Sequence, residues 1–194
     1  MMAPNAQRRS EKSHQAILAA AMDLSAERGY GNVTVEAIAA RAGVSKKTIY
    51  RWWPTKGAVI LEALGELAQT ATTFPDTGDL VADLRTQTAA VLDFLASPRT
   101  GSAYLGLIAE TQHDEALARD LVEQLIKPRV AVAMDRLRSA QRQGQLSAEA
   151  DLELIVELLY GPIYYRRLLH LGPHADDRLH ALIDHVLSQW RARS

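Results

Sequence analysis

The 194-residue sequence contains no cysteine. This absence excludes disulfide bonds, cysteine-ligated zinc and thiol catalysis, and it fits a reducing cytosol. The first residues lack the apolar stretch of a signal peptide, and no later run approaches the roughly 18 apolar residues that a membrane-spanning helix requires. The sequence therefore predicts a soluble, cytoplasmic protein.

Signatures of catalysis are also missing. The sequence has no nucleophile–base pair, no phosphate-binding glycine loop and no HExxH motif. Its histidines do not form a metal-binding pattern: a Gly-Pro pair separates His170 from His174, and His180 and His185 are five residues apart rather than the four that suit helical ligands. We therefore predict no catalytic residue, no metal site and no cofactor, and we do not expect an enzyme.

The net charge of −1 conceals an uneven distribution. Residues 1–60 carry nine Lys and Arg against four acids, a net charge of +5, whereas the remainder carries a net charge of −6. A basic first part attracts a polyanion such as nucleic acid, and the acidic remainder disfavours binding elsewhere.

The hydrophobic pattern is helical throughout, without strand-like alternation, repeats or low-complexity tracts. We predict an all-α fold with two domains. Residues 11–56 should form an N-terminal three-helix bundle with a helix-turn-helix, and residues 57–194 a larger C-terminal helical domain. The predicted helices cover residues 11–28, 35–42, 46–53, 55–71, 79–96, 102–112, 114–143 (with a kink at Pro128), 151–170 and 176–192.

Residues 33–56 have the pattern of a helix-turn-helix. Thr34 can cap the first helix, Gly43 can end it in a left-handed conformation, and Ser45 can cap the second helix. Pro54 ends that second helix because proline disfavours helical conformation in the residue before it. In such a motif the second helix enters the major groove of DNA.

Ten residues of this motif stand at a characteristic spacing. They are Thr34, Gly43, Val44, Ser45, Thr48, Ile49, Tyr50, Trp53, Pro54 and Lys56. Over roughly residues 13–60 the sequence thereby resembles the DNA-binding domain of the TetR family of bacterial transcriptional regulators. The helical remainder is similar to the larger ligand-binding and dimerisation domain of that family.

The resemblance implies a homodimeric repressor that binds a palindromic operator in double-stranded DNA. A small-molecule ligand that prefers another conformer would then weaken DNA binding. Two alternatives remain open. One is an effector-independent DNA-binding dimer, and the other is an enzyme with its site in the C-terminal part, for which the sequence supplies no paired acid and base.

The resemblance also implies which residues contact DNA. Thr34 should bind a phosphate, and Tyr50 and Lys56 should contact the DNA backbone. Trp52 fits either a groove contact or packing, whereas Glu36 would repel phosphate, so we expect no base reading from the first helix. The predicted DNA-binding residues are Thr34, Ser45, Lys46, Lys47, Thr48, Tyr50, Arg51, Trp52 and Lys56.

The last two predicted helices are strongly apolar. Residues 151–170 are apolar on nearly all sides, and residues 176–192 carry an unbroken apolar stripe. Since one small core can hardly cover both, we predict that the same helices of a second copy complete a four-helix bundle. The predicted interface residues are Leu152, Ile155, Leu159, Tyr165, Leu179, Leu182, Ile183, Val186 and Trp190.

Arginines and tyrosines gather near the end of the first of these helices. Arg166 and Arg167 can pair with Glu153 or Glu157 across the dimer, and a ligand pocket is the alternative reading. Apolar and aromatic residues with a few polar ones predict a pocket for a small apolar or aromatic ligand. These residues are Phe94, Tyr104, Ile108, Thr111, Gln112, Tyr160 and Tyr164.

Overall fold

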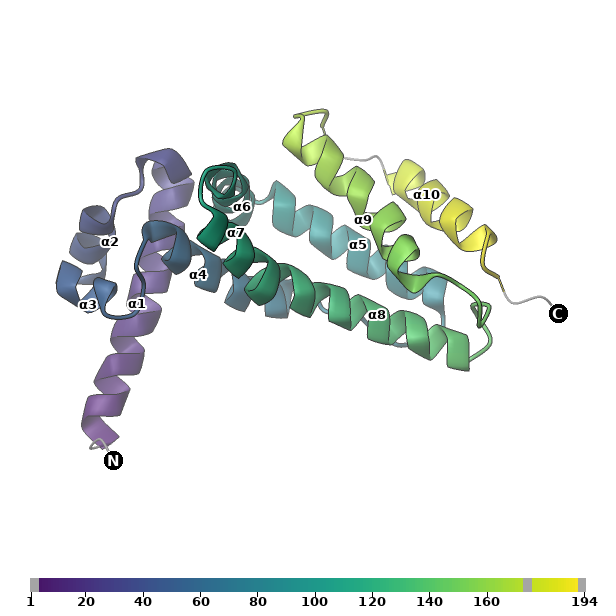
Figure 1. The fold of residues 1–194 in the computed structure, drawn as a ribbon, viewed down its shortest axis with the longest axis horizontal. Coiled ribbons are helices and arrows are strands. Elements are labelled where there is room, and N and C mark those ends of the chain that lie inside the picture. The colour runs from purple at the N-terminus through teal and green to yellow at the C-terminus, as the bar shows by residue number, and fades with distance from the viewer. Residues whose placement is uncertain (1–3, 173–175, 192–194) are drawn as a thin grey trace. The chain divides into compact units, whose positions relative to one another are not determined.

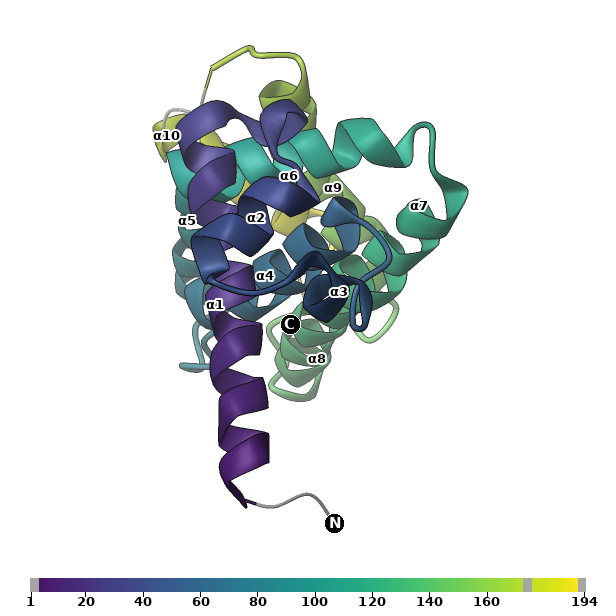
Figure 2. The ribbon, with the colours of Figure 1, turned by 90° about the vertical axis from the view of Figure 1, so that its left-hand side faces the viewer.

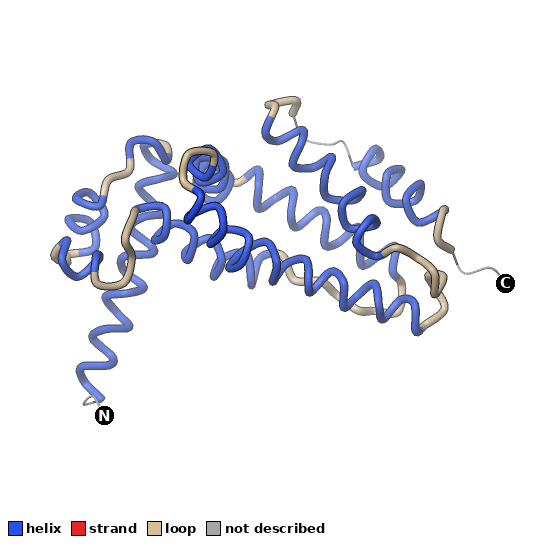
Figure 3. Tube along the Cα trace, viewed as in Figure 1, coloured by secondary structure: helices blue, strands red, loops and turns tan. Residues whose placement is uncertain are grey.

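The computed structural model describes residues 4–172 and 176–191. Its regular structure is helical (Figures 1 and 3), and across the described residues an isolated bridge pairs Leu146 with Arg191. The all-α prediction is confirmed. No described helix is long and apolar enough to cross a membrane.

The chain folds into two compact units, each built from two stretches of sequence. Unit 1 consists of Met1–Ala68 and Ser97–Leu125, and unit 2 consists of Gln69–Ala96 and Ile126–Ser194. Unit 1 therefore extends beyond the DNA-binding domain that we predicted over residues 11–56. The reason is that α6 (Pro98–Thr111) packs against α1 (Pro4–Arg28).

In unit 1 the other helices lie around the C-terminal half of α1 (Figure 2). Besides α1 and α6 this unit contains a 3₁₀ turn, η1 (Tyr30–Asn32), α2 (Val35–Ala42), α3 (Lys46–Tyr50), most of α4 (Lys56–Ala71) and α7 (Glu115–Leu121). Apolar side chains spaced along α1 fill the centre of the unit, where Ile17, Ala21 and Leu24 are almost fully buried.

The predicted helix-turn-helix forms with its predicted caps. The Thr34 hydroxyl accepts a hydrogen bond from the Ala37 amide at 3.1 Å, and the Ser45 hydroxyl accepts one from the Thr48 amide at 3.1 Å. Gly43 ends α2 with φ at +66°, the left-handed conformation that glycine adopts at little cost. α3 ends at Tyr50, three residues earlier than we predicted, although the Trp53 amide still donates to the Ile49 carbonyl at 2.9 Å.

Several further helix boundaries differ from the prediction: α1 begins at Pro4 rather than at residue 11, α9 ends at Leu168 rather than at residue 170, and α10 ends at Ser188 rather than at residue 192. We expected Ser97 and Pro98 to end the preceding helix and the next helix to begin at residue 102. The structure shows instead that α6 begins at Pro98. Ser97 is the N-cap of α6, and its hydroxyl oxygen accepts a hydrogen bond from the Arg99 amide at 3.2 Å. Proline is well tolerated in the first helical turn, because the amide hydrogen that it lacks would have no partner there.

The predicted long helix over residues 114–143 is divided. It consists of α7, a π-helical turn η2 (Val122–Ile126) and α8 (Lys127–Arg142). The turn lies just before Pro128, whose nitrogen has no hydrogen to donate to the preceding turn. A π-turn is one way in which a helix accommodates such a missing bond.

Unit 2 is built mainly from four helices that pack around a shared core. They are α5 (Leu80–Ala96), α8, α9 (Leu152–Leu168) and α10 (Asp176–Ser188). α10 packs against α5 and α9, and α9 packs against α8. Their facing side chains, such as Leu84, Leu137 and Ile183, are at most 1% exposed and form the core.

This packing corrects part of the predicted dimer interface. Five predicted interface residues are only 0–3% exposed because α5, α8, α9 and α10 bury them within unit 2, so they leave no surface for a partner. They are Ile155, Leu159, Leu179, Ile183 and Val186. Tyr165 is 57% exposed, and Leu152, Leu182 and Trp190 are half-buried.

A charged network lies in the core of unit 2. The Arg136 Nε donates a hydrogen bond to the Asp83 carboxylate at 2.7 Å, and the Nη2 of the same guanidinium lies 2.6 Å from that carboxylate as an ion pair, although both side chains are at most 2% exposed. Thr77 donates to Asp83 as well, through its hydroxyl at 2.7 Å. The network ties α5 to α8 and to the loop before α5.

Candidate nucleic-acid interface

Five of the predicted DNA-binding residues lie together on the outer side of α3. Ser45, Lys47, Thr48, Tyr50 and Arg51 line a shallow surface hollow of about 400 Å³. They face outward because Ile49 and Trp53, one helical turn apart, face the other way. These two side chains are 0% and 3% exposed and fix the segment to the core of unit 1. The hollow presents hydroxyl, ammonium and guanidinium donors, which suit phosphate oxygens and base acceptors.

Lys46 does not line this hollow, and it has an acidic partner. Its ammonium lies 2.9 Å from the carboxylate of Glu36 on α2. The hydrogen bond from Lys46 lowers the pKa of Glu36, and the same bond raises the pKa of Lys46. We predicted that Glu36 repels phosphate, and the structure shows that Lys46 offsets that charge. Both side chains are exposed, so the pair adds little to stability.

Thr34 lies at the start of α2 and is exposed. Because its hydroxyl oxygen caps the helix, its hydroxyl hydrogen can be donated to a phosphate. The phosphate contact of Thr34 stays a prediction.

Lys56 begins α4, but its ammonium is partly buried. It donates to the Tyr30 carbonyl at 3.2 Å, lies 4.6 Å from the centre of the Tyr30 ring and is 3.9 Å from the Glu110 carboxylate. For Lys56 to bind a phosphate as predicted, its ammonium must therefore give up its contacts with Tyr30 and Glu110.

Trp52 is half-buried and is not part of the hollow. Its ring centre lies 5.1 Å from that of His14 and 5.4 Å from that of Trp53, and the Arg51 guanidinium lies over it at 5.1 Å. Of the two readings that we left open for Trp52, this favours packing.

The predicted ligand-pocket residues divide between the two units. Tyr104, Ile108, Thr111 and Gln112 belong to unit 1; Phe94, Tyr160 and Tyr164 belong to unit 2. In unit 2 the Tyr160 hydroxyl donates to the Gln87 side chain, and burial raises the pKa of this tyrosine. This hydrogen bond and the burial give Tyr160 a packing role.

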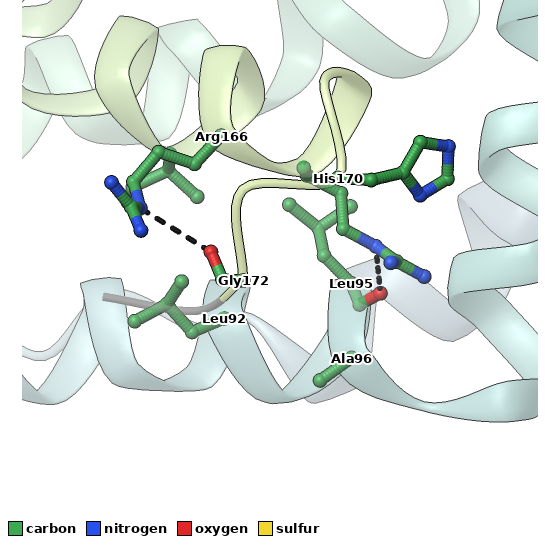
Figure 4. A pocket seen from close by; sticks show the side chains of 8 residues that line it. Leu92, Leu95, Ala96, Arg166, His170 and Gly172 are labelled. Carbon is green, nitrogen blue, oxygen red and sulfur yellow. Dashed lines mark hydrogen bonds between the residues drawn. The ribbon is translucent and has the colours of Figure 1, made fainter. Parts of the chain in front are cut away.

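Unit 2 contains a cavity of about 190 Å³ near the end of α9 (Figure 4), and none of the predicted pocket residues lines it. Its lining consists of Leu92, Leu95, Ala96, Ile163, Arg166, Arg167, His170 and Gly172. The floor is apolar and the rim is basic. Arg166 and Arg167 had a ligand pocket as their alternative reading, but no sequence signal indicated the rest of the lining, because the cavity forms where the turn after α9 folds back toward α5.

Hydrogen bonds to the backbone position both arginines of the rim. Arg166 donates to the carbonyls of Leu171 at 2.6 Å and Gly172 at 3.2 Å, and Arg167 donates to the carbonyl of Leu95 at 2.9 Å. Within unit 2 these carbonyls replace the glutamate partners that we predicted across a dimer.

Two family models match the chain. Residues 17–63 match the model described as bacterial regulatory proteins, tetR family. Residues 74–186, more than half of the chain, match the model described as tetracyclin repressor-like, C-terminal domain.

Similar proteins span almost the whole chain. The HTH-type transcriptional regulator YdeS of Bacillus subtilis is 41% identical over 169 residues, which cover 87% of this chain and 84% of that protein. The DNA-binding transcriptional repressor TetR of Mycobacteroides abscessus is 31% identical over 180 residues, covering 92% and 94%. The crystal structure of the TetR family regulator SCO0332 matches with a TM-score of 0.80 and 34% identity, covering 91% and 97%. The chain therefore belongs to the TetR family of DNA-binding transcriptional regulators.

Proposed function

We propose that this protein is a homodimeric repressor that binds a palindromic operator through α3 and is released when a small molecule binds unit 2. The hollow on α3 carries the proposal, because it gathers five donor-bearing side chains on one exposed surface. A relative named as a DNA-binding transcriptional repressor supports the direction of regulation. In this proposal residues 11–56 form the DNA-binding domain, and residues 57–194 serve ligand binding and dimerisation.

The outer face of α9 supports the dimer. Leu154, Leu158, Tyr165 and Leu168 recur at helical spacing along it and are 40–57% exposed. An exposed apolar stripe of this kind on a monomer marks an interaction site. We propose that the same face of a second copy covers it, which brings two copies of α3 to one palindrome.

The cavity at the end of α9 supports regulation by a ligand. Leu92, Leu95 and Ile163 can hold a small apolar or aromatic body, and Arg166 and Arg167 can face an anionic group. Its volume of about 190 Å³ is below the roughly 300 Å³ of ordinary drug-sized sites. We therefore propose a small carboxylic acid as the effector class.

A gel-shift series on the upstream region of the gene tests the DNA-binding part. We expect Lys47→Ala to weaken binding at least tenfold, since it removes a cation from the hollow. Arg119→Ala, at an exposed cation of α7, is the matched control and should bind as the wild type does. Equal binding of the wild type to a scrambled duplex would contradict a sequence-specific function.

The same assay with benzoate or hexanoate distinguishes the ligand-regulated dimer from the effector-independent alternative. We expect at least one acid to weaken the DNA complex in the gel shift and to raise the melting temperature of the protein in a separate thermal-unfolding measurement. Leu92→Trp, which fills the cavity, should abolish both effects. If the acids have no effect on the wild type, the carboxylic-acid class is wrong. If filling the cavity also leaves regulation unchanged in a reporter strain, the effector-independent dimer is supported.

A further inference from the structure

Three potential metal ligands lie together in unit 1. His14 lies on α1, and Glu62 and Glu66 lie one turn apart on α4. A donor atom from each of the three lies within 4.8 Å of the other two, and His14 Nε2 is 2.7 Å from a Glu62 oxygen. We propose that these residues bind a divalent transition-metal ion, such as Zn²⁺, which joins α1 to α4.

Neighbouring donors hold both carboxylates in place. The Trp53 indole nitrogen donates to the second oxygen of Glu62 at 2.6 Å, and the Gln15 amide donates to Glu66 at 3.3 Å. The His14 ring lies 4.9 Å from the Trp53 ring, which restricts its orientation. Metal sites characteristically have such partners around their ligands, because these partners fix the direction of the coordinating atoms.

The charges of the cluster also favour a cation. Glu62 and Glu66 stand at i and i+4, where like charges repel. Among the described residues no lysine or arginine forms an ion pair with either of them, and His14 is the group that faces Glu62. A divalent ion balances both carboxylates and binds neutral imidazole.

The donor set selects the class of ion. One imidazole nitrogen with two carboxylate oxygens suits zinc-like ions, whereas magnesium and calcium prefer oxygen donors alone. The side chains of His14 and Glu62 are 25% and 39% exposed, so an ion can enter and water can complete its coordination. The sequence did not reveal this group, because its histidine lies 48 residues from the nearer glutamate.

Isothermal titration of the EDTA-treated full-length protein with ZnCl₂, without DNA, tests the site. We expect one high-affinity Zn²⁺ per chain, and at least tenfold weaker binding for His14→Ala and for Glu66→Gln. His185→Ala, at an exposed histidine of unit 2, is the matched control and should retain wild-type affinity. MgCl₂ should give no comparable heat, because magnesium prefers oxygen donors alone.

Several outcomes would overturn the proposal. They are wild-type Zn²⁺ affinity in His14→Ala or Glu66→Gln, an equal loss in His185→Ala, or equal binding of magnesium and zinc. Glu66 is exposed, so Glu66→Gln keeps the test valid should His14→Ala fail to fold. Tryptophan fluorescence gives a second readout, since Trp53 adjoins the cluster and should respond to Co²⁺ in the wild type. Because no DNA is present, failure of DNA binding leaves this test unaffected.

Discussion

At the scale of single residues, the pairing of Glu36 with Lys46 sets the charge that α2 and α3 present to DNA. The two side chains are 2.9 Å apart and exposed, so phosphate can compete for the lysine. Glu36→Gln removes one negative charge and frees the Lys46 ammonium. We expect a three- to tenfold gain in affinity for non-specific duplex DNA, with a steeper dependence on salt. Fluorescence anisotropy at several salt concentrations measures both quantities.

The control for this prediction is another exposed acid. Glu115 faces Arg119 at 3.9 Å on α7, and Glu115→Gln makes the same charge change away from α3. An equal gain in both variants would mean that net charge, rather than the position of Glu36, determines the effect.

A second residue-scale prediction concerns Gly106 on α6. A Cβ at this position would lie 2.2 Å from Cβ and Cγ of Tyr30, which is itself buried against α6. Because this clash involves the rigid base of a side chain, we expect Gly106→Ala to destabilise unit 1 by about 2 kcal/mol. Urea unfolding measures the change.

Gly65→Ala is the matched control. A Cβ at Gly65 meets nothing within 4 Å, so alanine there should stabilise α4 by about 0.5–1 kcal/mol through its helix propensity. Destabilisation of similar size by both substitutions would refute the argument from the contact with Tyr30.

At the scale of elements, the buried pair of Arg136 and Asp83 joins α8 to α5. Asp83→Asn leaves the buried guanidinium with only the exposed Asp76 carboxylate, 3.4 Å away, as a counter-charge, and we expect a loss of about 3 kcal/mol in the free energy of unfolding. Asp135→Asn affects an exposed pair with Arg138 at 2.9 Å and should change stability by less than about 1 kcal/mol. Similar values for the two variants would contradict the proposed difference.

The same pair makes the stability of unit 2 depend on pH. Burial raises the pKa of Asp83, but hydrogen bonds from Thr77 and Arg136 and the charge of Arg136 outweigh burial and lower it. A lowered pKa in the folded state contributes stability that is complete above the unfolded value of about 3.9 and is lost as the pH falls through the folded value. Acid unfolding should therefore show a smaller loss of stability below pH 4 in Asp83→Asn.

Which elements could be predicted from the sequence depends on how local their causes are. Thr34, Gly43 and Ser45 act on residues within one turn, so the helix-turn-helix and its caps were predictable. The π-turn before Pro128 and the early start of α6 at Pro98 depend on how the helix accommodates a proline. The spacing of apolar residues does not predict this. Asp83 gave no signal, because its partner lies 53 residues away.

At the scale of the whole molecule, hydrophobicity predicted which helices are buried but not what covers them. The stripe of α10 and the apolar sides of α9 indicated a partner chain, yet Ile183 and Ile155 are each 0% exposed within unit 2. Five of the nine predicted DNA-contacting residues gather at α3, because this short helix and the residues that flank it carry them. The predicted ligand residues come from separate helices, and their grouping depends on packing that one sequence does not specify.

The surface left uncovered on α9 leads to a prediction about assembly. Leu158 lies at the centre of this outer stripe and is 41% exposed. A glutamate there would place a charge in an apolar interface between two copies, and burying an unpaired charge is costly. We expect Leu158→Glu to shift the protein from dimer to monomer in sedimentation velocity while its circular dichroism stays unchanged.

Val132→Glu on α8 is the matched control, since Val132 is also 41% exposed and lies outside the stripe. It should remain dimeric. Because a palindrome requires two copies of α3, the monomeric Leu158→Glu variant should also lose most of its affinity for the operator while retaining non-specific binding. A dimeric Leu158→Glu variant would show that another face joins the two copies. A monomeric variant with full operator affinity would show instead that one copy of α3 suffices for recognition.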